Sequence, residues 1–130
     1  MERRTLLLCG LLALTGCGAA GTARKPGVGS AKAGDRVAGL ADVPEGTGKL
    51  VDLPGDGQVL VVRTDAGVRV FNPACPHQGT VVNPPAKGVI TCPTHRSAFD
   101  PSTGAVLSGP SPRGLVEVPV RVTGDDVLLA

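Results

Sequence analysis

The side chains in this chain that are best suited to chemistry lie in two short segments, Cys75-Pro76-His77 and Cys92-Pro93-Thr94-His95. Residues 78–91 separate the segments, which together hold both histidines and two of the four cysteines of the chain. Thiolate sulfur and imidazole nitrogen are common protein ligands of zinc and iron. The two segments therefore predict a metal centre.

Each segment offers one thiolate and one imidazole, and this mixed pairing bears on which metal is bound. A structural zinc finger usually groups its Cys pair and its His pair separately. One type of two-iron cluster instead uses two Cys on one iron and two His on the other. The pattern favours that cluster. A zinc site with the same ligands, a Cys75–Cys92 disulfide with two uninvolved histidines, and a Cys–His nucleophile remain as alternatives.

The residues around these segments resemble a known family. The chain resembles the Rieske [2Fe–2S] family, whose pattern is Cys-x-His, a spacer, Cys-Pro-x-His, a Phe-Asp-x-x-Thr-Gly stretch and a Gly-Pro loop. The matching segments here are residues 75–79, 92–95, 99–104 and 109–110. The resemblance extends from about Val37 to the C-terminus and implies one [2Fe–2S] cluster per chain.

The resemblance also implies which residues hold the cluster. Cys75 and Cys92 would bind one iron, and His77 and His95 would bind the other. Pro110 belongs to the Gly-Pro loop, which covers the cluster from a third side in the family. These residues form the expected cofactor site.

Two further positions bear on the reduction potential. Ser97 stands where high-potential family members donate a hydroxyl hydrogen bond to a cluster sulfur, whereas Phe99 stands where they place a second donor, a Tyr. Hydrogen bonds to sulfur raise the potential because they stabilise the extra negative charge of the reduced cluster. Because one of the two donors is kept, we expect a reduction potential between those of disulfide-free Rieske ferredoxins and those of quinol-oxidising Rieske proteins.

Two threonines depart together from the subgroup that serves quinol-oxidising respiratory complexes. In that subgroup each cluster loop carries an additional Cys, and the two form a disulfide; Thr80 and Thr94 stand at those positions. The joint replacement implies the disulfide-free, ferredoxin-like subtype. Because such a cross-link stabilises by about 2–4 kcal/mol, more mobile cluster loops and a more labile cluster are expected.

Arg96 is the third departure, because the family usually has Gly directly after the last His. A glycine there often adopts a positive φ, which strains the backbone of an arginine unless the turn differs. Arg96 either places a positive charge beside the cluster, which would favour the reduced state, or is simply a substitution that faces solvent.

Short strands must position these loops, because the composition disfavours long helices and an aromatic core. The chain has 130 residues, enough for one small domain with tails. Its 19 Gly and 12 Pro interrupt Val-rich stretches, and it has two Phe, no Trp and no Tyr. We expect an all-β fold of the Rieske type, an antiparallel sandwich or barrel with a loop-rich cluster-binding subdomain at residues 72–112.

Alternating apolar residues around Gly-containing turns predict two hairpins. Pro119 suggests that one arm of the second hairpin is an edge strand or contains a bulge. Two earlier strands are predicted on either side of a turn at residues 44–48. The predicted strands are residues 37–43, 49–53, 58–63, 68–71, 115–122 and 127–129.

The N-terminal region resembles an export and anchoring segment. Residues 1–16 have the basic start, apolar stretch and small residues of a signal peptide, and Arg3-Arg4 resembles a twin-arginine signal. Cys17 follows Leu14-Thr15-Gly16, which resembles the lipobox of bacterial lipoproteins, so Cys17 is expected to carry a lipid. The alternative is an ordinary secretory signal in which a Cys stands at this position by chance. Residues 17–36 are expected to form the lipidated, flexible tether, and residues 37–130 the Rieske domain.

These features predict a one-electron carrier held by its lipid anchor at the extracytoplasmic face of the cell membrane. A net charge of +2 gives no argument for nucleic acid as a partner. The sequence has no dinucleotide-binding glycine motif and no haem Cys-x-x-Cys-His motif, so we expect it to serve redox partner proteins rather than to be a complete enzyme. The alternative is a non-redox lipoprotein that keeps the Rieske fold for metal binding or interaction.

Overall fold

The computed structural model describes residues 24–130, so the predicted signal peptide, the predicted lipid site at Cys17 and the first part of the predicted tether lie outside the described residues. Among residues 24–130, no helix is long and apolar enough to cross a membrane. The elements, in chain order, are β1 (Lys25–Pro26), β2 (Arg36–Gly39), the 3₁₀ helix η2 (Leu40–Asp42), β3 (Thr47–Asp52), β4 (Gly57–Thr64), β5 (Gly67–Phe71), β6 (Ile90–Thr91), β7 (Ala98–Phe99), β8 (Val106–Ser108), β9 (Val120–Thr123) and β10 (Asp126–Leu129).

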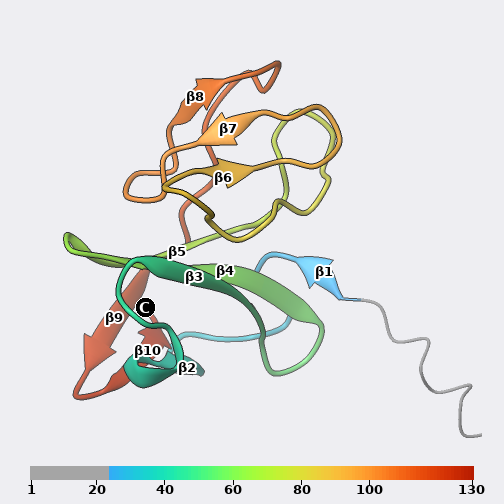
Figure 1. The fold of residues 1–130 in the computed structure, drawn as a ribbon. Coiled ribbons are helices and arrows are strands. Elements are labelled where there is room, and N and C mark those ends of the chain that lie inside the picture. The colour runs from blue at the N-terminus through green and yellow to red at the C-terminus, as the bar shows by residue number, and fades with distance from the viewer. Residues whose placement is uncertain (1–23) are drawn as a thin grey trace, which may run out of the picture.

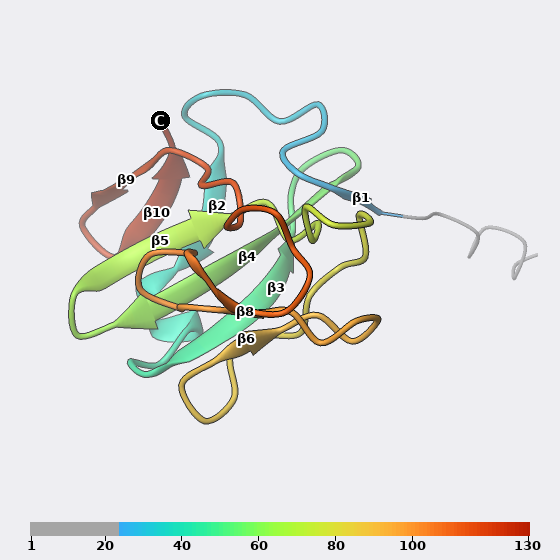
Figure 2. The same ribbon diagram turned by 90° about the horizontal axis from the view of Figure 1, so that it is seen from above.

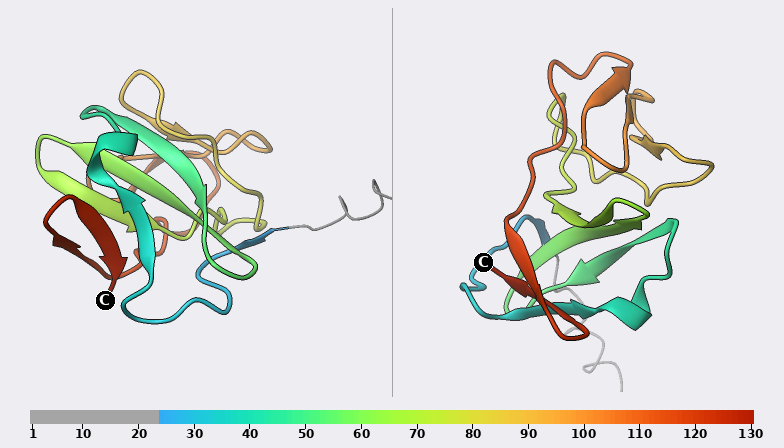
Figure 3. Two further views of the ribbon diagram at one scale, coloured as in Figure 1. Left: turned by 90° about the horizontal axis from the view of Figure 1, so that it is seen from below. Right: turned by 90° about the vertical axis from the view of Figure 1, so that its left-hand side faces the viewer.

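The strands form three small sheets, which confirms the expected all-β fold. In the middle sheet, β4 pairs antiparallel with β3 and β5 and parallel with β1. A second sheet, in the order β2-β10-β9, lies on one side of it, and the third, β6-β7-β8, lies on the other side (Figure 1). The side view in Figure 3 shows the same order of layers, and Figure 2 shows β6 and β8 lying over the middle sheet.

The central strand β4 is apolar on both faces because both faces are covered. Val59 and Val61 pack into a core shared with β2 and β10. Leu60 and Val62 point to the opposite face, as alternate residues of a strand do, and pack into a second core that contains Cys75 and Cys92. All four β4 residues are at most 1% exposed. The middle sheet therefore separates the two cores, and the core on one of its faces contains both cysteines.

Both predicted hairpins are present, but the second is shorter than predicted. The β4–β5 pair runs as expected to the turn before Gly67. β9 begins only at Val120, so the prediction of a strand from residue 115 was wrong. Residues 115–119 instead lead from the third sheet back to the base, where Glu117 forms an isolated bridge to Phe71. Pro119 directly precedes β9, which is an edge strand.

The strand predicted over residues 37–43 is also shorter than expected. β2 ends at Gly39, and the chain then turns into η2. The Arg63 guanidinium donates hydrogen bonds to the carbonyl oxygens of Leu40 at 3.0 Å and Val43 at 3.4 Å. The Leu40 carbonyl also accepts the Val43 N–H at 3.1 Å, so these carbonyls are satisfied by the Arg63 side chain and by the turn itself instead of by a neighbouring strand.

Residues 24–36, which were predicted to be part of a flexible tether, instead pack along the edge of the middle sheet; we call them the N-terminal strap. Gly27 and Gln58 exchange two backbone hydrogen bonds, of 2.8 and 2.9 Å. The Arg24 guanidinium donates to the carbonyl oxygen of Gly55 at 2.7 Å. The composition suggested flexibility because the strap has little to bury, but hydrogen bonds to the sheet hold it. The folded part thus begins before residue 37.

A charged contact also fastens the strap. The Ser30 N–H donates to the Asp56 carboxylate at 3.2 Å. This hydrogen bond, aided by the nearby Lys25 ammonium, lowers the pKa of Asp56 from its usual value. The carboxylate is therefore held in its charged form against the strap.

Residues 72–116 form a loop-rich subdomain between β5 and the start of the C-terminal hairpin; we call it the loop subdomain. It holds the short strands β6, β7 and β8, and its connection to the base is tight at Gly104. A Cβ added there would lie 2.6 Å from Phe71 Cε1, and the φ of Gly104 is +80°. Only glycine can bring the backbone this close to the buried Phe71 ring in that conformation. At Gly104 the loop subdomain is therefore packed closely against Phe71 of the middle sheet.

Candidate metal centre

The two Cys-Pro segments fold into turns of the same form, which we call the first loop (residues 75–80) and the second loop (residues 92–97). In each loop the N–H of the fourth residue after the Cys donates to the Cys carbonyl oxygen, at 2.7 Å in the first and 2.8 Å in the second. The Cys N–H donates to the carbonyl oxygen of the fifth residue after the Cys, at 2.8 Å in the first loop and 2.9 Å in the second. These backbone bonds fix each cysteine at the start of a closed turn. The residues that close the turns are Gly79, Thr80, Arg96 and Ser97.

Both turns require a left-handed backbone at the same position. Gly79 has a φ of +79° in the first loop, and Arg96 has a φ of +60° in the second. The expected positive φ after the last His is therefore present, although the residue is an arginine. Glycine adopts this conformation freely, whereas an L-residue with a side chain is strained in it by about 1–2 kcal/mol.

The loops bury their sulfurs and expose their imidazoles. Cys75 and Cys92 are each 2% exposed and belong to the core below the loops. His77 and His95 are exposed, and their ring centroids lie 4.8 Å apart with the planes at 77°. The four predicted ligands thus form two levels, with thiols facing the protein and imidazoles facing solvent.

Two threonines join the loops. Thr94 Oγ1 of the second loop donates to Thr80 Oγ1 of the first at 2.9 Å. These are the positions at which the sequence suggested that a family disulfide is replaced. A hydrogen bond between hydroxyls therefore connects the loops where the cross-link would lie.

Ser97 lies fully buried at the end of the second loop, where a third segment reaches it. Its Oγ accepts the backbone N–H of Ser111 at 3.0 Å. Gly109, with a φ of +95°, allows this approach, because a Cβ there would lie 2.9 Å from Ser97 Oγ. Since a hydroxyl both accepts and donates, the Ser97 hydrogen is available to another acceptor in the site. Pro110 is exposed on this third segment.

The donor set fits a two-iron cluster. Cys75 and Cys92 are both free thiols, so the structure does not contain the disulfide considered as an alternative. Within residues 24–130, no three His, Cys, Asp or Glu side chains are grouped closely enough to hold a metal ion. In a two-iron cluster with mixed ligands, one iron takes two thiolates and the other takes two imidazoles. The two buried cysteines and the two exposed histidines offer one pair of each kind.

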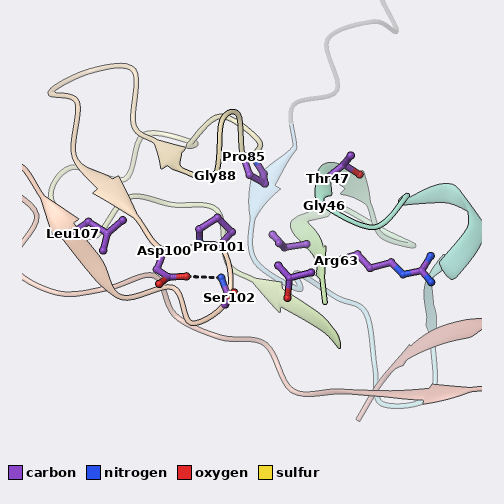
Figure 4. Close-up of a pocket in the computed structure, with 11 residues that line it drawn as sticks. Gly46, Thr47, Arg63, Pro85, Gly88, Asp100, Pro101, Ser102 and Leu107 are labelled. Atoms are coloured by element: carbon purple, nitrogen blue, oxygen red, sulfur yellow. Dashed lines mark hydrogen bonds between the residues drawn. The ribbon is translucent and has the colours of Figure 1, made fainter. Parts of the chain in front are cut away.

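A cavity of about 280 Å³ lies away from these ligands, between the middle sheet and the loop subdomain. Figure 4 shows Pro85, Gly88, Asp100, Pro101 and Leu107 on one side of it and Gly46 and Thr47 on the other, with the Arg63 guanidinium directed away. Asp100 accepts the Ser102 N–H at 2.7 Å within its wall. No Cys or His lines this cavity, so it is separate from the candidate centre.

Two contributors to the site were missed by the sequence reasoning. Gly79 was not recognised as the partner of Arg96, although both lie four residues after a Cys-Pro cysteine. Ser111 was also missed, because a backbone N–H leaves no mark in the sequence. The common spacing after each Cys could have revealed Gly79.

The fold is that of a small all-β protein, and the candidate site brings two buried cysteines and two exposed histidines onto two matching loops. Residues 35–120 match the model of the Rieske [2Fe-2S] domain, and the chain belongs to this family. Its cofactor is accordingly a Rieske [2Fe–2S] cluster.

Several known proteins resemble the chain. The cytochrome b6-f complex iron-sulfur subunit of Synechococcus sp. (strain CC9605) is 38% identical over 96 residues, covering 70% of this chain and 53% of the relative. The ferredoxin of carbazole 1,9a-dioxygenase from Nocardioides aromaticivorans IC177 has a TM-score of 0.59 and 30% identity, covering 76% of this chain and 98% of the ferredoxin. The plasma membrane Rieske protein PetC3 from Synechocystis PCC 6803 has a TM-score of 0.55 and 34% identity, and the match covers 64% of this chain and 85% of PetC3.

The curated relatives are longer than the matching region. The chain spans 30% of the first of them and about half of the cytochrome b6-f subunits. What those whole proteins do therefore applies to this chain only as a proposal.

Proposed function

We propose that this chain is a one-electron carrier in which Cys75 and Cys92 bind one iron of the cluster and His77 and His95 bind the other. The observation that carries the proposal is the pair of matching Cys-Pro turns, with both sulfurs buried and both imidazoles exposed 4.8 Å apart. When bound, the cluster supplies a reversible one-electron oxidation and reduction. Similarity to a dioxygenase ferredoxin and to cytochrome b6-f subunits supports this role.

The proposed ligands and their neighbours have three different roles in the site. The two cysteine sulfurs would hold their iron on the buried side of the site, because Cys75 and Cys92 pack in the core with Leu60 and Phe99, away from solvent. The exposed imidazoles present the edge at which a partner protein can approach most closely. Ser97 is proposed to donate its free hydroxyl hydrogen to a sulfur, which raises the reduction potential.

We assign the chain to the disulfide-free, ferredoxin-like subtype. The hydrogen bond between Thr80 and Thr94 at the cross-link positions supports this assignment. The similarity to a ferredoxin over 98% of that ferredoxin's length also agrees with it. In such a protein the loops are held by backbone turns and hydroxyl contacts instead of a covalent bridge.

We also propose that the protein is exported and held at the extracytoplasmic face of the membrane by a lipid on Cys17. The support is the lipobox-like segment before Cys17 and the Arg3-Arg4 pair. A twin-arginine route suits a protein that receives its cluster before export. Its partners would be redox proteins or a larger oxidoreductase at that membrane.

Low-temperature EPR of the dithionite-reduced protein tests the carrier proposal. Iron, acid-labile sulfide and zinc are assayed on the same sample, with protein determined by amino-acid analysis because the chain has no Trp or Tyr. We expect the rhombic signal of a His-ligated two-iron cluster with about two irons per chain. Zinc, or no metal after anaerobic reconstitution, would instead support the non-redox binding module.

Export and anchoring need separate tests. Replacing Arg3-Arg4 with Lys-Lys should leave precursor in the cytoplasm, and normal export would remove the twin-arginine assignment. Cys17→Ser should release the protein from the membrane fraction, and [³H]palmitate labelling of the wild type alone should confirm the modified residue.

A further inference from the structure

Charges are distributed unevenly between the two parts of the fold. The loop subdomain (residues 72–116) holds three basic residues, Lys87, Arg96 and Arg113, and one acidic residue, Asp100. The remaining described residues, which we call the base, hold eight basic and nine acidic residues. The part that carries the metal centre is therefore net positive, while the base is slightly negative.

The two parts also differ in how their charges are paired. Among residues 24–130, every ion pair joins two residues of the base: Arg24–Asp52, Lys25–Asp56, Arg36–Asp42, Arg36–Asp126 and Arg69–Glu117. Arg96 forms none of them and is exposed beside His95. Asp100, the acidic residue of the loop subdomain, lies on the wall of the cavity that holds no ligand residue. The exposed tip thus presents a positive charge with no carboxylate among residues 75–80, 92–97 or 109–111.

Arg96 occupies this place at a conformational cost. The equivalent turn position of the first loop is Gly79, which has the same backbone hydrogen bond and a similar φ. Arg96 is held at a φ of +60° with no side-chain hydrogen bond or ion pair among the described residues to offset the strain. Strain of this kind at a site is often linked to what the side chain does for function. For an exposed guanidinium next to a ligand, that contribution is charge presented to an approaching molecule.

We propose that the exposed tip formed by His77, His95 and Arg96 docks a redox partner whose surface around its own redox centre is acidic, with Arg96 as the charged contact. The inference rests on the proposed carrier function. Opposite charges at the two surfaces accelerate encounter and orient the imidazole edge toward the partner's centre. Carboxylates are the complementary groups, because the tip offers a guanidinium and no acidic residue.

The charge at the tip can be measured with two small oxidants of opposite sign, hexacyanoferrate(III) and tris(phenanthroline)cobalt(III). Each takes one electron from the reduced holoprotein and is itself reduced by one electron. Stopped-flow rate constants are compared for the wild type, Arg96→Gln, Arg96→Lys and Arg121→Gln. Gln keeps the strained backbone and removes the charge, Lys keeps both, and Arg121 is an exposed arginine of β9, in the base.

We expect Arg96→Gln to slow the anionic oxidant and speed the cationic one. The ratio of the two rate constants should change at least about tenfold at low ionic strength and much less at roughly 1 M salt, where charges are screened. Arg96→Lys and Arg121→Gln should leave the ratio near that of the wild type. A change in reduction potential would move both rates in one direction, so the ratio separates charge from driving force.

Binding of poly-L-glutamate and of phosphatidylglycerol vesicles identifies the kind of partner. Arg96-dependent binding of the peptide supports an acidic protein partner, whereas Arg96-dependent binding of vesicles alone would assign the tip to lipid and overturn the proposal. An unchanged rate ratio in Arg96→Gln would also overturn it, while a normal EPR signal in the same samples would leave the carrier function standing. Loss of the EPR signal from the wild type would be a failure of the carrier function itself.

Discussion

Thr94 Oγ1 donates a 2.9 Å hydrogen bond to Thr80 Oγ1, and this contact joins the two loops that carry the proposed cluster ligands. Each threonine lies within its loop's backbone turn or directly at its end. The contact is exposed to solvent, so its net contribution is small compared with that of a covalent bridge. It nevertheless links the first loop to the second at Thr94, the residue directly before His95.

Breaking this contact should make the cluster easier to lose. Thr80→Val and Thr94→Val should each speed cluster loss, and the effect of the double variant should be smaller than the sum of the two single effects by a coupling of about 0.5–1 kcal/mol. Bleaching of the visible absorbance in chelator gives the rates. Thr94→Ser keeps the hydroxyl and serves as the control. Strictly additive effects would show that the hydrogen bond contributes nothing to holding the loops.

Ser97→Ala should lower the reduction potential. The variant removes a hydroxyl that is proposed to donate to a sulfur, and a hydrogen bond to a charged group contributes about 1.5–3 kcal/mol, which corresponds to roughly 60–130 mV for one electron. Protein-film voltammetry provides the measurement. Ser111→Ala is the matched control, because it removes the hydrogen bond from Ser111 Oγ to the Arg113 carbonyl and leaves the backbone N–H in place. Equal potentials in the wild type and Ser97→Ala would exclude the sulfur contact.

Substitutions at the two left-handed positions should have opposite effects on the free energy of unfolding. Arg96→Gly relieves backbone strain and should stabilise the protein by about 1 kcal/mol. Gly79→Ala should destabilise it by a similar amount, and the cause would be purely conformational because a Cβ at Gly79 meets no atom within 4 Å. Arg96→Ala keeps the strain and should be nearly neutral. Urea unfolding of the four proteins compares them directly, and a destabilised Arg96→Gly would contradict the strain argument.

Removing the N-terminal strap should destabilise the folded part. A chain that begins at residue 37 loses the hydrogen bonds between Gly27 and Gln58, that of Ser30 to Asp56 and those of Arg24, so we expect a loss of about 2 kcal/mol relative to a chain that begins at residue 24. Thermal unfolding of the two chains, both loaded with cluster, measures the difference. Equal stability would mean that the strap is a passive tether, as its composition suggested.

The sequence by itself determined the all-β fold and the four candidate ligands. Val-rich alternation broken by Gly and Pro is a local signal, and the two Cys-Pro segments with their histidines are short enough to be recognised without knowing how the chain folds. The left-handed turn at Arg96 could also be anticipated, because the family that the chain resembles usually has Gly directly after the last His.

Only the tertiary structure decided the relationships that depend on packing between distant segments. The run from Val59 to Val62 is apolar throughout because two cores meet on opposite faces of β4, and no local pattern separates that case from a single core. The N-terminal strap is held by backbone hydrogen bonds to the sheet, which composition does not encode. The Thr80–Thr94 hydrogen bond and the hydrogen bond from the Ser111 N–H to Ser97 Oγ likewise join segments that are separated in the chain. They form because these segments pack on the same hydrophobic core, and that core exists only once the whole chain has folded.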